Sequence, residues 1–196
     1  MFLVVGLGNP GPEYAGTYHN LGFLAVERLA ERNSIRIGRP DSKAITGRGA
    51  IAGKEVLLAQ PQTYMNLSGA SIAPLMEKHG IRPADLIVVY DELDLPWTGV
   101  RIRPSGSAGG HHGMESLIRA LGTEELIRVR LGIHPGHPVR DGAEFVLSPI
   151  RKPQLKELDE LLERAAEAVE SIIAEGVEKA MTRFNRRAQG SKLEEQ

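Results

Sequence analysis

Residues 86–92 read Leu-Ile-Val-Val-Tyr-Asp-Glu, and this stretch decides the class of fold. Its first five residues are all apolar or aromatic, which is typical of a strand buried on both faces of a parallel sheet. The apolar run stops abruptly at Asp91 and Glu92. In open α/β sheets, sites lie beyond the carboxyl ends of such strands, so Asp91 is the first candidate for a functional residue.

Further strand patterns lie on both sides of this stretch. Apolar runs predict strands at 2–5, 100–103 and 126–133. Residues 44–51 and 55–60 predict a hairpin that turns at Gly53-Lys54.

Helical spacing of apolar residues separates these strands and predicts helices at 19–32, 66–79, 114–121 and from 155 to about 181. Gly80 should end the second helix, and Pro74 should kink it or delay its start. Alternating strands and helices predict an α/β fold with a mixed, mostly parallel sheet covered by helices on both faces. We expect one domain over 1–196, of which 186–196 form a disordered tail.

The composition is that of an ordinary globular domain: 196 residues, 41% hydrophobic and 25% charged. The absence of cysteine excludes disulfides, thiolate zinc sites and a cysteine nucleophile. With no signal peptide and no apolar run of ~20 residues, we expect a monomeric cytosolic protein without membrane association. The net charge of −1 argues against unselective coating of nucleic acid, but Arg103 and Arg130 near glycines leave a local anion site open.

Polar residues should gather at one edge of the predicted sheet. Asn9 follows the first strand, and Asp91 ends the central one. His19, Asn66 and His111 fall at the starts of predicted helices. Because the carboxyl ends of parallel strands share one edge, all five side chains are expected near each other.

Several familiar chemistries fit the sequence poorly. Residues 6–11, Gly-Leu-Gly-Asn-Pro-Gly, match a dinucleotide-binding pattern, but the prolines at 10 and 12 oppose the helix it requires. No Gly-x-Ser-x-Gly follows a strand, so a serine nucleophile is not indicated. The side chains of the adjacent His111 and His112 diverge, and the His134–His137 pair has no clustered carboxylates beside it, so we expect no metal and no cofactor. Water is then the expected nucleophile.

A histidine and an aspartate remain as the candidates for activating that water. Histidine is the natural general base near neutral pH, and a carboxylate bonded to Nδ1–H fixes its tautomer. We select His19 and Asp91 for these roles. A lone histidine is more often a helix-end cap or a satisfied core residue, and His79 beside Gly80 is expected to be such a cap.

Several segments together resemble the bacterial peptidyl-tRNA hydrolase family, in the family's order and spacing over nearly the whole chain. They are the segments 6–11 with Tyr14, 19–22 (His-Asn-Leu-Gly), 61–69 (Pro-Gln-Thr-Tyr-Met-Asn-Leu-Ser-Gly), 91–96 (Asp-Glu-Leu-Asp-Leu-Pro), 106–111 (Gly-Ser-Ala-Gly-Gly-His) and 128–133 (Arg-Val-Arg-Leu-Gly-Ile). The resemblance implies a cytoplasmic enzyme that cleaves the ester between peptide and tRNA.

The resemblance also implies roles for individual residues. His19 would accept a proton, and Asp91 would keep it basic. Asn9 would distinguish a blocked peptidyl group from a free ammonium, and with Asn66 would hold the scissile carbonyl. His111 belongs to the substrate site, in a role that is either chemical or orienting.

The expected RNA contacts follow in the same way. Tyr14 and Tyr64 would stack on the 3′ end of the tRNA, and Met65 would line the cleft or lie in the core. Arg103 and Arg130 would grip a phosphate of the acceptor stem. The glycine-rich stretch 105–113 fits a mobile cover, or a plain surface loop.

Two residues depart from the family pattern. His112 stands where an asparagine is usual, which puts one substrate contact in doubt. Tyr18 stands where an arginine is frequent, and this change should affect only the rim of the cleft. The competing hypotheses are a non-catalytic RNA-binding relative and, more distantly, a dinucleotide-dependent oxidoreductase.

Overall fold

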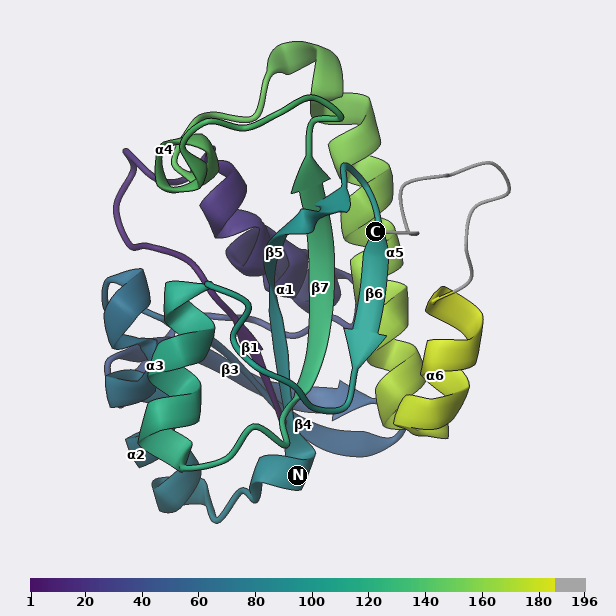
Figure 1. Cartoon of the computed structure of the whole chain (residues 1–196). Helices are drawn as coiled ribbons and strands as arrows, with labels where there is room; N and C mark the ends of the chain where they lie inside the picture. Colours follow the sequence, from purple (N-terminus) through teal and green to yellow (C-terminus); the bar gives the residue numbers. More distant parts are fainter. Residues whose placement is uncertain (186–196) are drawn as a thin grey trace.

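A computed structural model of the chain describes residues 1–185; the tail expected at 186–196 lies outside the described residues. The described part contains one seven-stranded sheet in the order β2-β3-β4-β1-β5-β7-β6 (Figure 1). Its strands are β1 (Phe2–Gly6), β2 (Arg39–Asp41), β3 (Ala44–Ile51), β4 (Lys54–Pro61), β5 (Leu86–Pro96), β6 (Val100–Arg103) and β7 (Ile127–His134).

The four central strands β4, β1, β5 and β7 are parallel, and the outer strands join the sheet antiparallel. This arrangement confirms the mixed, mostly parallel sheet. It also brings the carboxyl end of β1 beside the residues of β5 that precede Asp91, because Val5 pairs with Val88 and Gly6 with Val89. The expected site edge is therefore formed by neighbouring strands.

Helices cover both faces of the sheet, as predicted (Figure 1). One face carries α1 (Leu21–Arg32), α5 (Leu155–Glu175) and α6 (Val177–Phe184); the other carries α2 (Ser68–His79) and α3 (His112–Leu121). The short α4 (Gly142–Val146) lies over the carboxyl edge. Single 3-10 turns occur at Tyr18–Asn20, Met65–Leu67, Pro83–Asp85 and Lys152–Gln154. In residues 1–185, no helix has the length and apolar character that a bilayer crossing demands.

Glycines at 6 and 22 let the segment that carries His19 pack directly on the sheet. A Cβ built on Gly22 would lie 2.4 Å from the carbonyl oxygen of Val89, and one on Gly6 would lie 2.1 Å from that of Gly22. Real Cβ atoms do not approach backbone so closely, so only glycine permits this contact. The turn Tyr18–Asn20 is thereby held against the ends of β1 and β5.

Four details differ from the sequence-based expectations. The helix expected from 155 to about 181 is broken at Gly176 into α5 and α6. The β3–β4 hairpin turns at Ala52-Gly53 rather than Gly53-Lys54, with both residues in the left-handed region. Strand β5 continues to Pro96, because after a register shift its end pairs with His134 on β7. Asp91 therefore lies within the strand rather than after it. Helix α2 begins at Ser68 and runs through Pro74 to Gly80, whose φ of 64° ends it as predicted.

Candidate active site

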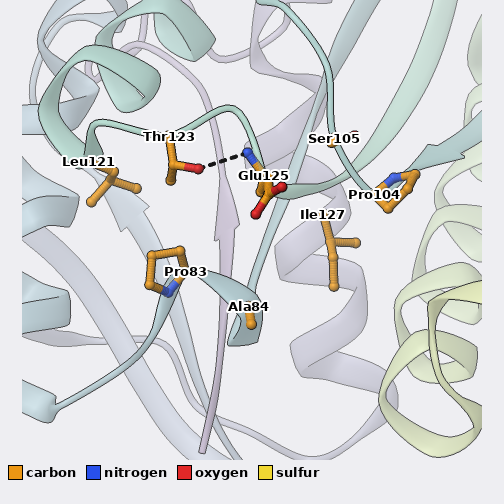
Figure 2. Close-up of a pocket in the computed structure, with 8 residues that line it drawn as sticks. All are labelled: Pro83, Ala84, Pro104, Ser105, Leu121, Thr123, Glu125 and Ile127. Carbon is orange, nitrogen blue, oxygen red and sulfur yellow. Dashed lines mark hydrogen bonds between the residues drawn. The ribbon is translucent and has the colours of Figure 1, made fainter.

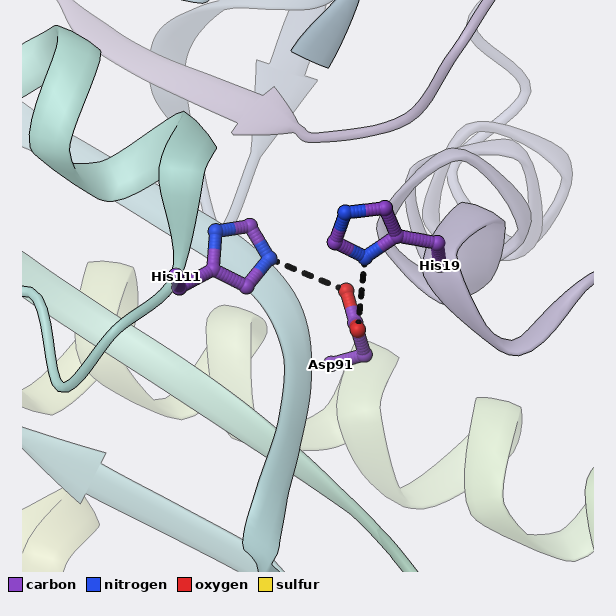
Figure 3. Close-up of side chains that lie close together, drawn as sticks. All are labelled: His19, Asp91 and His111. Atoms are coloured by element: carbon purple, nitrogen blue, oxygen red, sulfur yellow. Dashed lines mark hydrogen bonds and ion pairs between the residues drawn. The ribbon is translucent and has the colours of Figure 1, made fainter. Parts of the chain in front are cut away.

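Two histidines converge on one carboxylate at the carboxyl edge of the sheet (Figure 3). Nδ1 of His19, from the turn before α1, lies 2.8 Å from Oδ2 of Asp91. Nε2 of His111, from the residue that caps α3, lies 3.1 Å from Oδ1 of the same aspartate. The exposed fractions are 8%, 2% and 8% for His19, Asp91 and His111, so the three side chains form a buried cluster.

The hydrogen bonds of His111 determine which of its nitrogens carries a proton. Its Nδ1 accepts a hydrogen bond of 3.3 Å from the backbone N–H of Met114. A neutral imidazole with an accepting Nδ1 has its proton on Nε2, which then donates to Asp91. Both nitrogens of His111 are therefore occupied within the protein, and this ring is suited to orienting Asp91 rather than to moving a proton.

His19 differs because, among residues 1–185, only its Nδ1 has a hydrogen-bond partner. Nδ1–H donates to Asp91, so Nε2 retains a lone pair that can accept a proton. Burial raises the pKa of the Asp91 carboxyl, but the hydrogen bonds from His111 and His19 to its two oxygens outweigh burial and hold that pKa well below its usual range. The geometry is that of a histidine base whose tautomer is fixed by an ionised aspartate.

The same three side chains also meet the spacing of metal ligands, since their candidate ligand atoms all lie within 4.8 Å of one another. The sequence analysis did not single out this set. Its hydrogen bonds oppose coordination through His111, because Nε2 would have to lose its proton while Nδ1 still accepts from Met114. A metal-bound His111 would need the other tautomer, with two N–H groups facing each other.

Asn9 is held beside this cluster by a reciprocal pair of hydrogen bonds with Asn20. The Asn9 backbone N–H donates to Oδ1 of Asn20, and Nδ2 of Asn20 donates back to the Asn9 carbonyl, both at 2.9 Å. The Asn9 side-chain oxygen accepts from the backbone N–H of Met65 at 2.7 Å. Because the side-chain oxygen of Asn9 is engaged, its NH2 group is the part of the carboxamide that can donate a hydrogen bond to a ligand. Asn20 was missed by the sequence analysis, although it directly follows His19.

The remaining residues expected near the 3′ end of the RNA differ in exposure. Tyr64 is 59% exposed, Asn66 is also exposed, and Tyr14 is half-buried. Met65 is 4% exposed and belongs to the core between the sheet and α2–α3, where a Cβ on Gly113 would lie 2.6 Å from its sulfur. Of the two readings left open for Met65, the structure favours the core.

A cleft of ≈ 290 Å³ lies over the His–Asp–His cluster. Its lining combines the cluster with the end of β5, the glycines before α3 and the short helix α4; the lining residues include Glu92, Asp94, Gly109, Gly110, His112, Gly142 and Val146. Asn9, Tyr14, Tyr64 and Asn66 do not line this cleft. The expected carbonyl and RNA contacts therefore lie outside this cleft.

The two arginines of the expected phosphate site lie on adjacent antiparallel strands. Arg103 on β6 pairs in register with Arg128 on β7, and Arg101 pairs with Arg130. Arg130 is engaged by an acidic neighbour, since its Nη1 lies 2.9 Å from Oε1 of Glu92. Burial raises the pKa of the Glu92 carboxyl above its ordinary value, with Arg130 opposing that shift. A phosphate would have to share Arg130 with Glu92.

Arg128 is a structural residue, buried to 2% exposure. Its guanidinium donates to the backbone carbonyls of Ser107, Glu124 and Leu126 at 2.7–3.1 Å. The first part of the glycine-rich stretch 105–113 is thereby tied to β7. These hydrogen bonds argue against the expectation that the whole stretch 105–113 is a mobile cover of the cleft.

The two departures from the family pattern have different surroundings. Tyr18 was expected at the rim of the cleft, but its side chain is buried, with 4% exposed. Its ring stacks on Phe145 with centroids 5.0 Å apart and meets the edge of Trp97. Tyr18 therefore packs the segment of His19 against α4. His112 is exposed at the start of α3, and its Nδ1 lies 3.4 Å from Oε2 of Glu115.

A larger hollow lies elsewhere, at the amino ends of β5 and β7 (Figure 2). Its ≈ 600 Å³ are bounded mostly by apolar side chains, including Pro83, Leu121 and Ile127. Glu125 is the one titratable residue among those that line it. The chemistry is therefore concentrated at the carboxyl edge, in the smaller cleft.

A hydrolase built on one mixed α/β sheet, with a buried His–Asp–His cluster at the carboxyl edge, is the class of enzyme that this fold and site define. The sequence matches the family model of peptidyl-tRNA hydrolase over residues 3–193, and the chain belongs to that family. It is 64% identical to a peptidyl-tRNA hydrolase of Solibacter usitatus over the full length of both chains, and 54% identical to that of Koribacter versatilis over 95% of this chain and 94% of the relative. The crystal structure of peptidyl-tRNA hydrolase from Acinetobacter baumannii superposes with a TM-score of 0.86 at 36% identity, covering 94% of each chain.

Proposed function

We propose that this protein hydrolyses the ester bond between peptide and tRNA in peptidyl-tRNA, releasing free tRNA and an N-blocked peptide. The observation that carries the proposal is the buried contact between His19 Nδ1 and Asp91 Oδ2 in a chain of this family. We further propose that the protein works in the cytoplasm as a monomer, without a cofactor or a metal.

In the proposed reaction, Nε2 of His19 removes a proton from a water molecule as the water oxygen attacks the ester carbonyl. Asp91 stabilises the imidazolium that forms. When the carbonyl re-forms, the bond to the ribose oxygen breaks, and that oxygen takes up the proton from His19. The products are a carboxylic acid and a ribose hydroxyl, so the atoms of water are fully accounted for.

Asn9 and Asn66 would bind the carbonyl oxygen while it carries negative charge. The NH2 end of Asn9 is suited to this role because its oxygen is taken by the N–H of Met65. An uncharged carboxamide offers nothing to the ammonium of an unblocked aminoacyl group, which supports selection for blocked peptides. His111 would act as a positioning residue through Asp91.

The RNA contacts would be made around this centre. The exposed ring of Tyr64 and the half-buried ring of Tyr14 are available for stacking on the unpaired 3′ end. The buried Met65 would support Tyr64 and Asn66 from below rather than contact the substrate. Arg103 and Arg130 would bind a phosphate of the acceptor stem.

The proposal is tested by the release of free tRNA from N-acetyl-aminoacyl-tRNA. We expect release from this blocked substrate and at most slow release from unblocked aminoacyl-tRNA, which serves as the control. Binding of the tRNA without hydrolysis would favour the non-catalytic RNA-binding alternative. A nicotinamide-dependent thermal shift would revive the oxidoreductase hypothesis.

The phosphate contacts predict a change in salt dependence. Arg103→Ala and Arg130→Ala should mainly raise KM, and each should flatten the slope of log affinity against log salt by about 0.7–0.9. Lys156→Ala, on the exposed surface of α5, is the control for a lost positive charge. Unchanged slopes in both arginine variants would show that neither side chain contacts phosphate.

His112 gives a milder prediction. The variant His112→Asn restores the residue usual in the family and removes the contact with Glu115. Because a carboxamide and an imidazole each donate and accept hydrogen bonds, kcat should stay within a few-fold and KM should change more. Steady-state kinetics on the blocked substrate provide the check. Loss of turnover at unchanged KM would place His112 in the chemistry and contradict the assignment of the base to His19 alone.

A further inference from the structure

A second basic region lies between the C-terminal end of α2 and the strands β2 and β3. It surrounds a hollow of ≈ 320 Å³, here called the β2–β3 hollow. The charged and titratable residues of its lining are Arg36, Arg39, Asp41, Arg48, Lys78 and His79. Four permanent cations thus face a single acid, in a chain whose net charge is −1.

The single acid is already saturated by its own neighbours. Oδ1 of Asp41 accepts from Lys78 Nζ at 2.9 Å and from the hydroxyl of Ser42 at 3.0 Å, and Oδ2 accepts from His79 Nε2 at 3.0 Å. These contacts, led by His79 and Lys78, hold the pKa of the Asp41 carboxyl well below its usual range. His79 is therefore a partner of Asp41 rather than the helix cap that the sequence suggested.

The arginines are not neutralised in the same way. Arg36 and Arg39 are exposed and have no acidic partner within residues 1–185. Arg48 reaches Glu55 only at 3.7 Å, with both side chains more than half exposed. Exposed pairs at that distance contribute little. The hollow therefore keeps a surplus of guanidinium groups, the side chains best suited to phosphate oxygens.

The backbone that carries these arginines is fixed to the sheet. The N–H of Gly38 donates to Thr46 at 3.0 Å, and the hydroxyl of Thr46 donates to the carbonyl of Arg39 at 2.9 Å. A Cβ on Gly47 would lie 2.4 Å from the carbonyl oxygen of Arg36, so the segment rests directly on β3. The backbone of Arg36 and Arg39 is therefore fixed in the wall of the hollow.

Helix α2 connects this hollow with the candidate active site. Its first residue, Ser68, follows the turn of Met65 and Asn66, and its last two, Lys78 and His79, line the hollow. Twelve helical residues span about 18 Å. Strands β2 and β3 also lie at the edge of the sheet opposite to β6, which carries Arg103.

We propose that the β2–β3 hollow binds a backbone phosphate of the double-stranded arm of the tRNA, outside the phosphate contact of Arg103 and Arg130. This inference rests on the proposed function. The group recognised is a phosphate, and the helix length places it away from the ester. The hollow contributes to affinity for the whole tRNA and not to the chemical step.

The test measures tRNA binding and hydrolysis for Arg36→Gln/Arg39→Gln. Both side chains are exposed and lack acidic partners within residues 1–185, so the fold is retained, which a thermal melt checks. The salt slope of tRNA affinity should flatten by about 0.7–0.9 for each lost contact, with KM raised and kcat unchanged. The matched control is Lys156→Gln/Lys179→Gln, two exposed cations on α5 and α6, which should keep the wild-type slope.

A short substrate separates this inference from the proposed function. N-acetyl-aminoacyl ester on a trinucleotide lacks the double-stranded arm, so the arginine variant should cleave it as the wild type does. Equal salt slopes in the arginine variant and the lysine control would overturn the inference even if hydrolysis is normal. No hydrolysis of either substrate by the wild type would instead overturn the proposed function.

A free ion is the other source of phosphate chemistry. Inorganic phosphate, titrated while amide shifts of residues 36–48 are followed, should bind weakly and be displaced by tRNA. Shifts that phosphate causes but tRNA does not displace would identify a site for small anions only and contradict the RNA contact.

Discussion

Replacing His19 by alanine should lower turnover by at least ~100-fold while tRNA binding persists, because the variant loses the base and no phosphate contact. Within residues 1–185, Nε2 of His19 is the one ring nitrogen of the buried cluster whose lone pair accepts no hydrogen bond. Single-turnover release of tRNA measures the chemical step, and a gel-shift or anisotropy titration measures binding.

The control for this experiment is His137→Ala, the same change at an exposed histidine away from the cluster. Asp91 keeps its hydrogen bond from His111 in the His19 variant, so the aspartate is not left without a partner. Near-normal turnover in folded His19→Ala would remove the central assignment.

The variant Asp91→Asn should also lower turnover, at most by about as much as His19→Ala, because its effect is to block the same base. In the protein as it stands, two N–H donors meet two carboxylate oxygens. A carboxamide has one oxygen and one NH2 group. The N–H of one histidine would therefore point at that NH2 group, and two donors would oppose each other. If that histidine is His19, its proton moves to Nε2, and the base is blocked.

The pH profile distinguishes this explanation from a loss of structure. Against the effect of burial, the neighbouring histidines hold the Asp91 pKa below its ordinary value, so the carboxylate stays ionised in the wild type as pH falls through the range where histidine titrates. An uncharged carboxamide at this position cannot stabilise the imidazolium, and the residual activity of Asp91→Asn should therefore need higher pH. A variant with unchanged rate and pH profile would show that Asp91 only shapes the site.

The fold could be predicted from local patterns because its central strands are short apolar runs bounded by polar residues and glycine. The end of β5 could not, since residues 91–96 are rich in acids and join the sheet only through a register shift opposite His134. The start of α2 was also displaced, because a 3-10 turn takes up Met65–Leu67 before the helix.

The position of the His–Asp cluster at the carboxyl edge was predictable, but its contacts were not. Spacing brought His19 and Asp91 to one edge, yet it gave no sign that His111 shares the same carboxylate from the start of α3. Arg130 and Glu92 were both in view, but their ion pair depends on neighbouring strands of the folded sheet. Tyr18 was assigned to a rim because sequence alone does not reveal its packing on Phe145.

The occupied nitrogens of the cluster restrict the route of the proton in the proposed reaction. Asp91 receives a donor on each oxygen, and His111 has no vacant nitrogen, so the cluster offers no relay that leads away from the substrate. The proton taken from water and the proton given to the ribose oxygen must therefore pass through one atom, Nε2 of His19. The water oxygen and the ribose oxygen must therefore come within hydrogen-bond distance of Nε2 of His19 one after the other. A substrate bound too tightly at the ester could not make that exchange, and the reaction would stop at the intermediate. Turnover is therefore favoured when the ester is bound weakly and most of the affinity comes from distant phosphates.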